Sequence, residues 1–219
     1  MNIKICCISS IEEAEMAIAA GATALGLVGQ MPSGPGIIAD DLIGEIAAAV
    51  KGRVKTFLLT SETTLEGIVA HYEKAQTTTI QLVKKLGYGV HAELKKALPD
   101  VEIVQVIHVQ DEWAMNDAAE LMPFVDALLL DTGKPNASIP ILGGTGQTHD
   151  WSISEKVVRL STVPVYLAGG LNADNVAEAI EQVKPDGVDL CSGVRTMGKL
   201  DQEKLDDFIA ACTKNNNIE

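Results

Sequence analysis

The chain has 219 residues, of which 47% are hydrophobic and 4% aromatic, and its formal net charge is −13. This composition predicts one soluble domain with an aliphatic core. The charge argues against a surface for nucleic acid or anionic membranes, because both need clustered Lys and Arg. It does not exclude a small phosphate ligand, since backbone N–H groups and a helix N-terminus can hold one in an acidic protein.

The sequence also predicts the compartment and the state of the thiols. No apolar run approaches the roughly 20 residues of a membrane span, and the opening MNIKICCISS lacks the organisation of a signal peptide, so we expect a cytoplasmic protein. The four cysteines have neither zinc-knuckle spacing nor a secreted disulfide pattern, which predicts reduced thiols. Cys6 and Cys7 would point to opposite faces of a strand, so at most one should face a site.

Short β-rich runs alternate with amphipathic segments along the whole chain. The expected strands and helices, in chain order, are residues 3–8 and 11–20, 24–28 and 39–50, 54–59 and 63–74, 79–83 and 92–98, 101–109 and 112–121, 127–131 and 152–160, 165–168 and 172–182, and 187–191 and 202–212.

Eight such units, at about 27 residues each, predict a minimal α/β fold of the (β/α)₈ TIM barrel type. It would form a single domain over residues 1–213, followed by a polar tail at 214–219 that we expect to be frayed. An open doubly wound sheet is the alternative, because both architectures consist of right-handed βαβ units.

An acid ends the sixth predicted strand. The apolar residues 127–130 are typical of a strand buried on both faces, and Asp131 stands where this strand leaves the core. The following GGTG, which includes Gly144 and Gly146, lets the backbone approach a ligand, and Asp150 begins a helix. The segment indicates either a ligand site or a surface loop with an ordinary helix cap.

Two more loops carry Gly, Ser or Asn between an apolar strand and a helix. They are LAGGLNADNV at residues 167–176 and DLCSGV at residues 189–194. Loops after the seventh and eighth strands of a barrel often bind phosphate through backbone donors and a short helix N-terminus. Tight packing with a cap at Asn172 is the alternative, and two such loops in succession favour phosphate.

Taken together, these motifs resemble phosphoribosylanthranilate isomerase, a barrel enzyme of tryptophan biosynthesis. KICCIS resembles the family's KICGIT, GATALGLV its GADAVGFVF, LLLDT its LLDT, and GGTGQTHDWS its GGSGKTFDWS. LAGGLNADNV and DLCSGV resemble SGGLNPENV and DVSSGVE. The motifs occur in the same order over nearly the whole length.

The resemblance implies an isomerase that performs an Amadori rearrangement without a cofactor. Cys6 would be the general base and Asp131 the general acid: the acid opens the furanose ring to a Schiff base, and the base removes the proton of the adjacent carbon. Without the resemblance, a buried apolar thiol is the simpler interpretation of Cys6. No metal is expected, because the histidines show no ligand spacing; His149 is expected at the surface.

The resemblance also implies how a phosphorylated sugar would bind. Its phosphate would lie on the backbone of Gly169, Gly170, Ser192 and Gly193, with Gly144 and Gly146 in the loop above it. Asp189 is either a contact to a ribose hydroxyl or a structural acid that caps neighbouring loop N–H groups. A monomer and a homodimer are both compatible with the predicted outer helices.

The chain departs from the family pattern in three places. The family's anthranilate-binding Arg is replaced by Pro35, the His of its QLHG by Val83, and the Gly after the catalytic Cys by Cys7. Lys84 or Lys85 could supply a charge instead, or could be solvated. The departures leave two alternatives open: a paralogue that acts on or binds another sugar phosphate, and a noncatalytic homologue with a regulatory role.

Overall fold

The computed structural model describes residues 1–32, 34–133 and 148–213, and within these ranges eight parallel strands close into a barrel. Each strand pairs with the next along the chain, and the last pairs with the first. The barrel strands are β1 (Asn2–Ile5), β2 (Ala24–Val28), β3 (Lys55–Thr60), β4 (Thr79–Leu82), β5 (Glu102–His108), β6 (Ala127–Asp131), β7 (Val165–Leu167) and β8 (Gly187–Leu190).

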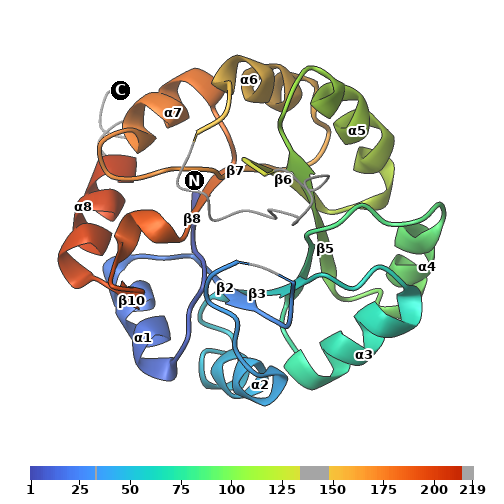
Figure 1. Cartoon of the computed structure of the whole chain (residues 1–219), viewed down its shortest axis with the longest axis horizontal. Coiled ribbons are helices and arrows are strands. Elements are labelled where there is room, and N and C mark those ends of the chain that lie inside the picture. Colours follow the sequence, from blue (N-terminus) through green and yellow to red (C-terminus); the bar gives the residue numbers. More distant parts are fainter. Residues whose placement is uncertain (33, 134–147, 214–219) are drawn as a thin grey trace.

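Eight α-helices of the described residues surround the barrel as an outer ring (Figure 1). They are α1 (Ile11–Ala20), α2 (Asp40–Ala49), α3 (Leu65–Ala75), α4 (Val90–Ala97), α5 (Trp113–Leu121), α6 (Trp151–Leu160), α7 (Val176–Val183) and α8 (Gln202–Thr213). The short 3₁₀ helices η1 (Met122–Phe124) and η2 (Ser192–Val194) and a hairpin of β9 (Arg195–Thr196) and β10 (Lys199–Leu200) complete the description. The predicted TIM barrel is confirmed, and the open sheet is wrong.

The core has two layers because successive side chains of a strand point to opposite faces. Outward-pointing residues such as Ile5, Leu25 and Leu128 pack with the inner faces of the helices. Inward-pointing residues fill the barrel, where the rings of Phe57 and Tyr166 meet edge to face with centroids 5.8 Å apart.

Local signals explain where several helices begin and end. The Ser10 side chain accepts a hydrogen bond from the N–H of Glu13 at the start of α1, and Gly21 ends this helix in the left-handed conformation, with φ 113°. The helix expected from Asn172 begins later, at Val176, because the Asn172 Oδ1 accepts the N–H groups of Asp174 and Asn175 and folds a turn before it.

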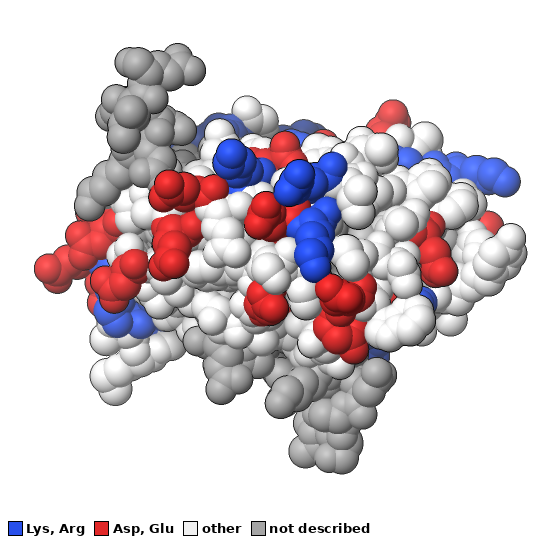
Figure 2. All heavy atoms as spheres, turned by 90° about the horizontal axis from the view of Figure 1, so that it is seen from above, with Lys and Arg blue, Asp and Glu red and all other residues white. Residues whose placement is uncertain are grey.

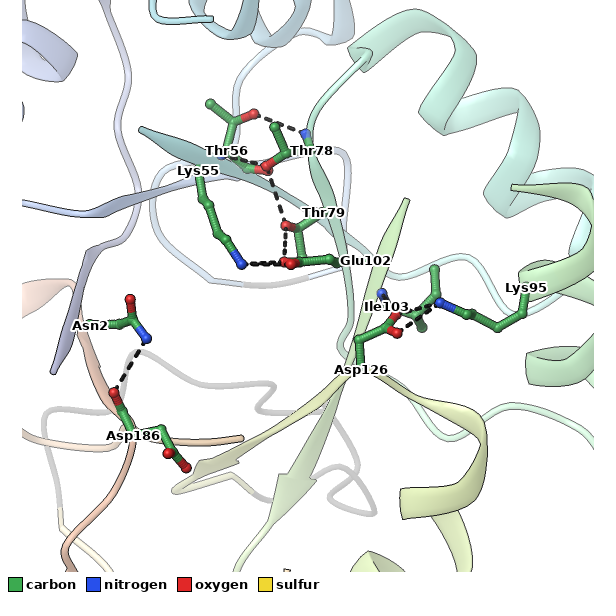
Figure 3. Close-up of polar contacts among 10 residues, drawn as sticks. All are labelled: Asn2, Lys55, Thr56, Thr78, Thr79, Lys95, Glu102, Ile103, Asp126 and Asp186. Carbon is green, nitrogen blue, oxygen red and sulfur yellow. Dashed lines mark hydrogen bonds and ion pairs between the residues drawn. The ribbon is translucent and has the colours of Figure 1, made fainter. Parts of the chain in front are cut away.

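Polar contacts tie the strands together at their N-terminal ends (Figure 3). Glu102 accepts hydrogen bonds from Lys55 Nζ at 2.6 Å and from Thr79 Oγ1 at 3.2 Å, so one carboxylate joins β3, β4 and β5. Asp126 accepts from Lys95 Nζ and from the backbone N–H of Ile103. This end of a TIM barrel serves stability, which leaves the opposite end for chemistry.

Acidic and basic side chains are interspersed on the face of the molecule that Figure 2 shows. Ion pairs also join neighbouring helices, for example Lys156 of α6 with Glu112 at the start of α5, at 2.9 Å. None of the described helices is long and apolar enough to cross a membrane.

A glycine at the start of β8 is required by the packing inside the barrel. A Cβ added to Gly187 would lie 2.6 Å from the ring carbons of Tyr166, which is 4% exposed and held against Phe57. We predict that Gly187→Ala lowers the free energy of unfolding by about 1–3 kcal/mol, because the ring has no free space to move into. Urea unfolding measures this loss.

Gly87→Ala is the matched control, since its Cβ would meet Val90 at an ordinary 3.8 Å. Equal stability of the two alanine variants would contradict the packing argument.

Candidate active site

A cavity lies at the C-terminal end of the barrel, where TIM barrels carry their active sites. Its lining combines acids, thiols, glycine-containing loops and apolar side chains: Cys6, Cys7, Val28, Met31, Gly34, Pro35, Leu59, Gln81, Val83, Asp131, Ala168, Gly169, Gly170, Leu171, Asp189, Leu190, Cys191 and Ser192. The predicted residues Cys6, Asp131, Gly169, Gly170, Asp189 and Ser192 therefore meet in one place. Gly193 follows Ser192 directly, whereas Gly144 and Gly146 lie outside the described residues.

Strand alternation brings Asp131 into this cavity. On β6, Leu128 and Leu130 pack outward in the layer shared with the helices, and Ala127 and Leu129 point into the barrel. Asp131 continues the inward set at the end of the strand. On β1 and β8 the same alternation turns Lys4, Cys6 and Asp189 inward.

A buried ion pair lies at the bottom of the cavity. Lys4 Nζ is 2.9 Å from Asp189 Oδ1, and the Lys4 side chain is 0% exposed. Complete burial acts to lower the pKa of Lys4, but the Asp189 carboxylate and the neighbouring thiols outweigh it, so the pKa is raised. Asp189 was expected at a ribose hydroxyl or as a cap for loop N–H groups; the partner that the structure gives it is Lys4.

Asp131 has the protonation behaviour of an acid catalyst. Burial, followed by the charge of Asp189, raises the pKa of its carboxyl to about 7, against the opposing effects of a hydrogen bond from the Thr132 N–H and of Lys4. A carboxyl group with such a pKa still holds a proton near neutral pH and can donate it.

Cys6 lies beside the buried ammonium. A Cβ added to Gly26 would be 2.6 Å from Cys6 Sγ and 3.1 Å from Lys4 Nζ, so the thiol and the ammonium share the space above this glycine. The backbone at Cys6 is fixed by Arg195, whose Nη2 donates to the carbonyl of Cys6 at 3.2 Å and to that of Cys7 at 2.6 Å. Glu13 holds this guanidinium at 3.0 Å.

The expected opposite orientation of the two neighbouring thiols is wrong. β1 ends at Ile5, and Cys7 has a left-handed backbone conformation with φ 63°, so the strand geometry no longer applies there. Cys6 and Cys7 both line the cavity. The Cys7 Sγ lies 2.6 Å from the Cys191 Sγ, which makes a row of three thiols.

The loops after β7 and β8 pack against each other around glycines. Gly169 and Gly170 have positive φ, 88° and 64°, and a Cβ on Gly193 would collide with the carbonyl of Leu171. The Asn175 Nδ2 donates to the Gly170 carbonyl, which holds the first loop. The backbone N–H groups of Gly169, Gly170, Ser192 and Gly193 belong to these two loops, and backbone N–H groups of such loops can bind an anion.

The other side of the cavity is largely apolar. Met31, Pro35 and Val83 are part of its lining, and Gln81 contributes a buried amide whose Oε1 has no partner among the described residues. Lys85 does not replace the missing Arg, because its Nζ is held by Asp117 at 2.9 Å and its side chain is 70% exposed.

The comparisons with known proteins agree with this geometry. The family model described as N-(5'phosphoribosyl)anthranilate (PRA) isomerase matches residues 3–211. The chain belongs to the PRA isomerase family. The isomerase of Microcystis aeruginosa is 34% identical over 94% of this chain and 94% of its own. An isomerase of Methanosarcina mazei is 34% identical over 95% and 92% of the two chains.

Solved structures of the family have the same fold. PRA isomerase from Thermotoga maritima superposes with a TM-score of 0.83 at 27% identity, over 97% of this chain and 98% of that one. A PRA isomerase in complex with reduced 1-(o-carboxyphenylamino)-1-deoxyribulose 5-phosphate has a TM-score of 0.81 at 25% identity, with the same coverage. The family and the aldose–ketose isomerase class expected from the motifs are confirmed.

Three features of the site were missed by the sequence interpretation. Lys4 is a charge in an otherwise apolar strand, and Gln81 is an amide in another; both interruptions were visible signals. His149, expected at the surface, is partly buried: its Nδ1 lies 3.0 Å from Thr132 Oγ1, and burial lowers its pKa to about 4. A hydrogen-bond partner of this kind cannot be read from spacing.

Breaking the buried ion pair should be costly. We predict that Asp189→Asn lowers the free energy of unfolding by about 3–5 kcal/mol, because it leaves the Lys4 ammonium buried without its carboxylate. The double variant Lys4→Met/Asp189→Leu should lose less than the single variant, since neither charge remains. Urea unfolding measures both.

Glu15→Gln is the control, because its ion pair with Arg53 is exposed and should contribute nothing measurable. If Asp189→Asn behaves like this surface variant, the site does not depend on the pair.

Proposed function

We propose that this chain catalyses the cofactor-free Amadori rearrangement of N-(5'-phosphoribosyl)anthranilate, with Asp131 as the general acid and Cys6 as the general base. The observation that carries the proposal is the pair itself: an acid with a pKa of about 7 and a thiol beside a buried ammonium line one cavity. Family membership supplies the reaction class.

The two residues divide the reaction into proton transfers. Asp131 gives its proton to the furanose ring oxygen, the C1'–O bond breaks, and the anthranilate nitrogen forms a Schiff base with C1'. The Cys6 thiolate then takes the proton of C2', which yields the enolamine; its tautomerisation gives the ketose amine. The Lys4 ammonium supplies positive charge next to the thiolate before this transfer.

The substrate phosphate would bind to the loops after β7 and β8. Backbone N–H groups of Gly169, Gly170, Ser192 and Gly193 supply donors whose positions are fixed by the contact of Gly193 with Leu171. Gly144 and Gly146 are proposed for the same phosphate from the motif alone. Asp189 is proposed to reach a ribose hydroxyl with the carboxylate oxygen that does not face Lys4.

A second candidate substrate is an N-phosphoribosyl amine with an uncharged aryl group. The apolar lining by Met31, Pro35 and Val83 favours it, because no described side chain of the lining carries a positive charge for a carboxylate. A charge-assisted hydrogen bond contributes about 1.5–3 kcal/mol, so its absence should reduce the preference for anthranilate over aniline derivatives.

The first experiment is turnover of freshly made phosphoribosylanthranilate, followed by the loss of anthranilate fluorescence. We predict that Cys6→Ser and Asp131→Asn each lower kcat by about 10² to 10⁴-fold, because each removes a proton-transfer group. The aniline analogue is measured in parallel to test the second candidate.

The matched controls are Cys212→Ser, a buried thiol of α8, and Asp126→Asn, an acid at the opposite end of the barrel. Both should keep the rate of the parent chain. If only the aniline compound is turned over, the proposed substrate is wrong and the proposed mechanism stands. Full activity of Cys6→Ser or Asp131→Asn would refute the roles assigned to these residues.

The pH dependence tests Asp131 separately. The carboxyl donates only while it is protonated, and its pKa of about 7 means that it loses the proton above that pH. We predict that kcat/KM falls about tenfold per pH unit on the alkaline side of this value. Initial rates between about pH 6 and pH 9 give the profile.

The residual activity of Asp131→Asn should lack this alkaline decrease, because the amide does not titrate. An unchanged profile in the variant would assign the decrease to another group.

A further inference from the structure

Three thiols form a continuous row along one wall of the cavity. Cys6 and Cys7 follow β1, and Cys191 follows β8, its neighbour in the barrel. The proposed mechanism uses only Cys6. Cys7 and Cys191 therefore have no part in that mechanism.

The positions of Cys7 and Cys191 suit a disulfide bond. Their sulfurs are 2.6 Å apart, so a movement of about half an ångström would bring them to bonding distance. Parallel pairing of Ile5 with Leu190 places both loops side by side, and the left-handed conformation of Cys7 turns its thiol toward Cys191.

The two thiols also differ in a way that favours reaction. Cys191 is partly exposed, whereas Cys7 is 5% exposed. Contact with the Cys7 thiol and the charge of Arg195 lower the pKa of Cys191, while contacts with the other thiols and burial raise that of Cys7. The accessible sulfur is therefore the better thiolate, and the buried one lies beside it as the resolving thiol.

We propose that Cys7 and Cys191 form a reversible disulfide that switches the enzyme off under oxidation by a peroxide. The Cys191 thiolate attacks one oxygen of hydrogen peroxide and becomes a sulfenic acid, and hydroxide leaves and is protonated to water. Cys7 sulfur then displaces the second water, with loss of its proton, and the S–S bond forms. Two thiols are oxidised and one peroxide is reduced to two waters; a dithiol reverses the process.

The disulfide would act on the phosphate side and on the loop above the cavity. Ser192 and Gly193 follow Cys191 directly, so a shift of its sulfur moves two proposed phosphate donors. Cys7 loses the S–H group that donates to the Pro35 carbonyl at 3.6 Å, which releases the loop lining the other side. We expect a higher KM for the phosphorylated substrate.

Cys6 is not the partner of Cys7 in this reaction. Adjacent cysteines close a strained eight-membered ring, whereas Cys191 meets Cys7 across two loops. Pairing with Cys191 therefore leaves the catalytic thiol reduced, so that activity returns when the disulfide is cleaved.

The test treats the purified full chain with hydrogen peroxide, alkylates the remaining thiols and maps the peptides by mass spectrometry. We expect one linkage between the segments containing Cys7 and Cys191 and its loss on reduction with a dithiol. The linkage should persist in Cys6→Ser and disappear in Cys7→Ser and Cys191→Ser. The thermal midpoint of the oxidised chain should rise by about 5 °C or more, because the bond closes a long loop.

The measurement of activity rests on the proposed function, whereas the detection of the disulfide by mass spectrometry does not. For each protein, the turnover rate after peroxide treatment is divided by its own rate before treatment. This ratio should fall at least about tenfold in the parent and in Cys212→Ser, and it should change little in Cys191→Ser. A link between Cys6 and Cys191, no link, or equal inactivation of Cys191→Ser would overturn the proposal. A link in a chain without isomerase turnover would refute the proposed function instead.

Discussion

The Lys4 ammonium is completely buried inside the barrel, and the neighbouring groups are arranged around its charge. A cation of this kind is tolerated only when a carboxylate lies against it, and Asp189 lies 2.9 Å away. Because Lys4 and Asp189 stand on the paired strands β1 and β8, the ion pair also fixes the two loops that leave these strands. Cys6, Cys191 and Ser192 owe their positions to that pair of strands.

The same charge separates the roles of the two acids. Asp189 is closest to the ammonium and neutralises it, so Asp131 lies in a buried environment that already contains a negative carboxylate, and its pKa is raised to about 7. The surroundings of Asp131 thus give its carboxyl the protonation behaviour that a general acid needs. Replacing Asp189 would therefore alter Asp131 as well as the stability of the barrel.

Much of the fold followed from the repeated succession of apolar runs and amphipathic segments in the sequence, and part of the site followed from the motifs at the ends of these runs. The continuous apolar run at residues 127–130 predicted a strand buried on both faces, and the alternation of side chains along that strand places Asp131 with Leu129 inside the barrel. The residue at which a strand ends could not be predicted in this way. Cys7 has a left-handed backbone conformation instead of an extended one, so its side chain lies on the cavity side, where only that of Cys6 was expected. Lys4 and His149 contact residues of other strands and loops, and the spacing of residues in one sequence does not predict such contacts.

The departures from the family pattern therefore have different physical consequences. Pro35 and Val83 stand where the family motifs have polar groups and give the cavity an apolar lining at these positions, which changes what can bind there. Cys7 and Cys191 instead place two sulfurs between the proposed base and the proposed phosphate loops. A change of about half an ångström there would affect both, since proton transfer and anion binding depend on fixed donor positions. With the proposed acid, base and phosphate loops beside Cys7 and Cys191, the same cavity would carry out the reaction and, through the proposed disulfide, contain a chemical means of interrupting it.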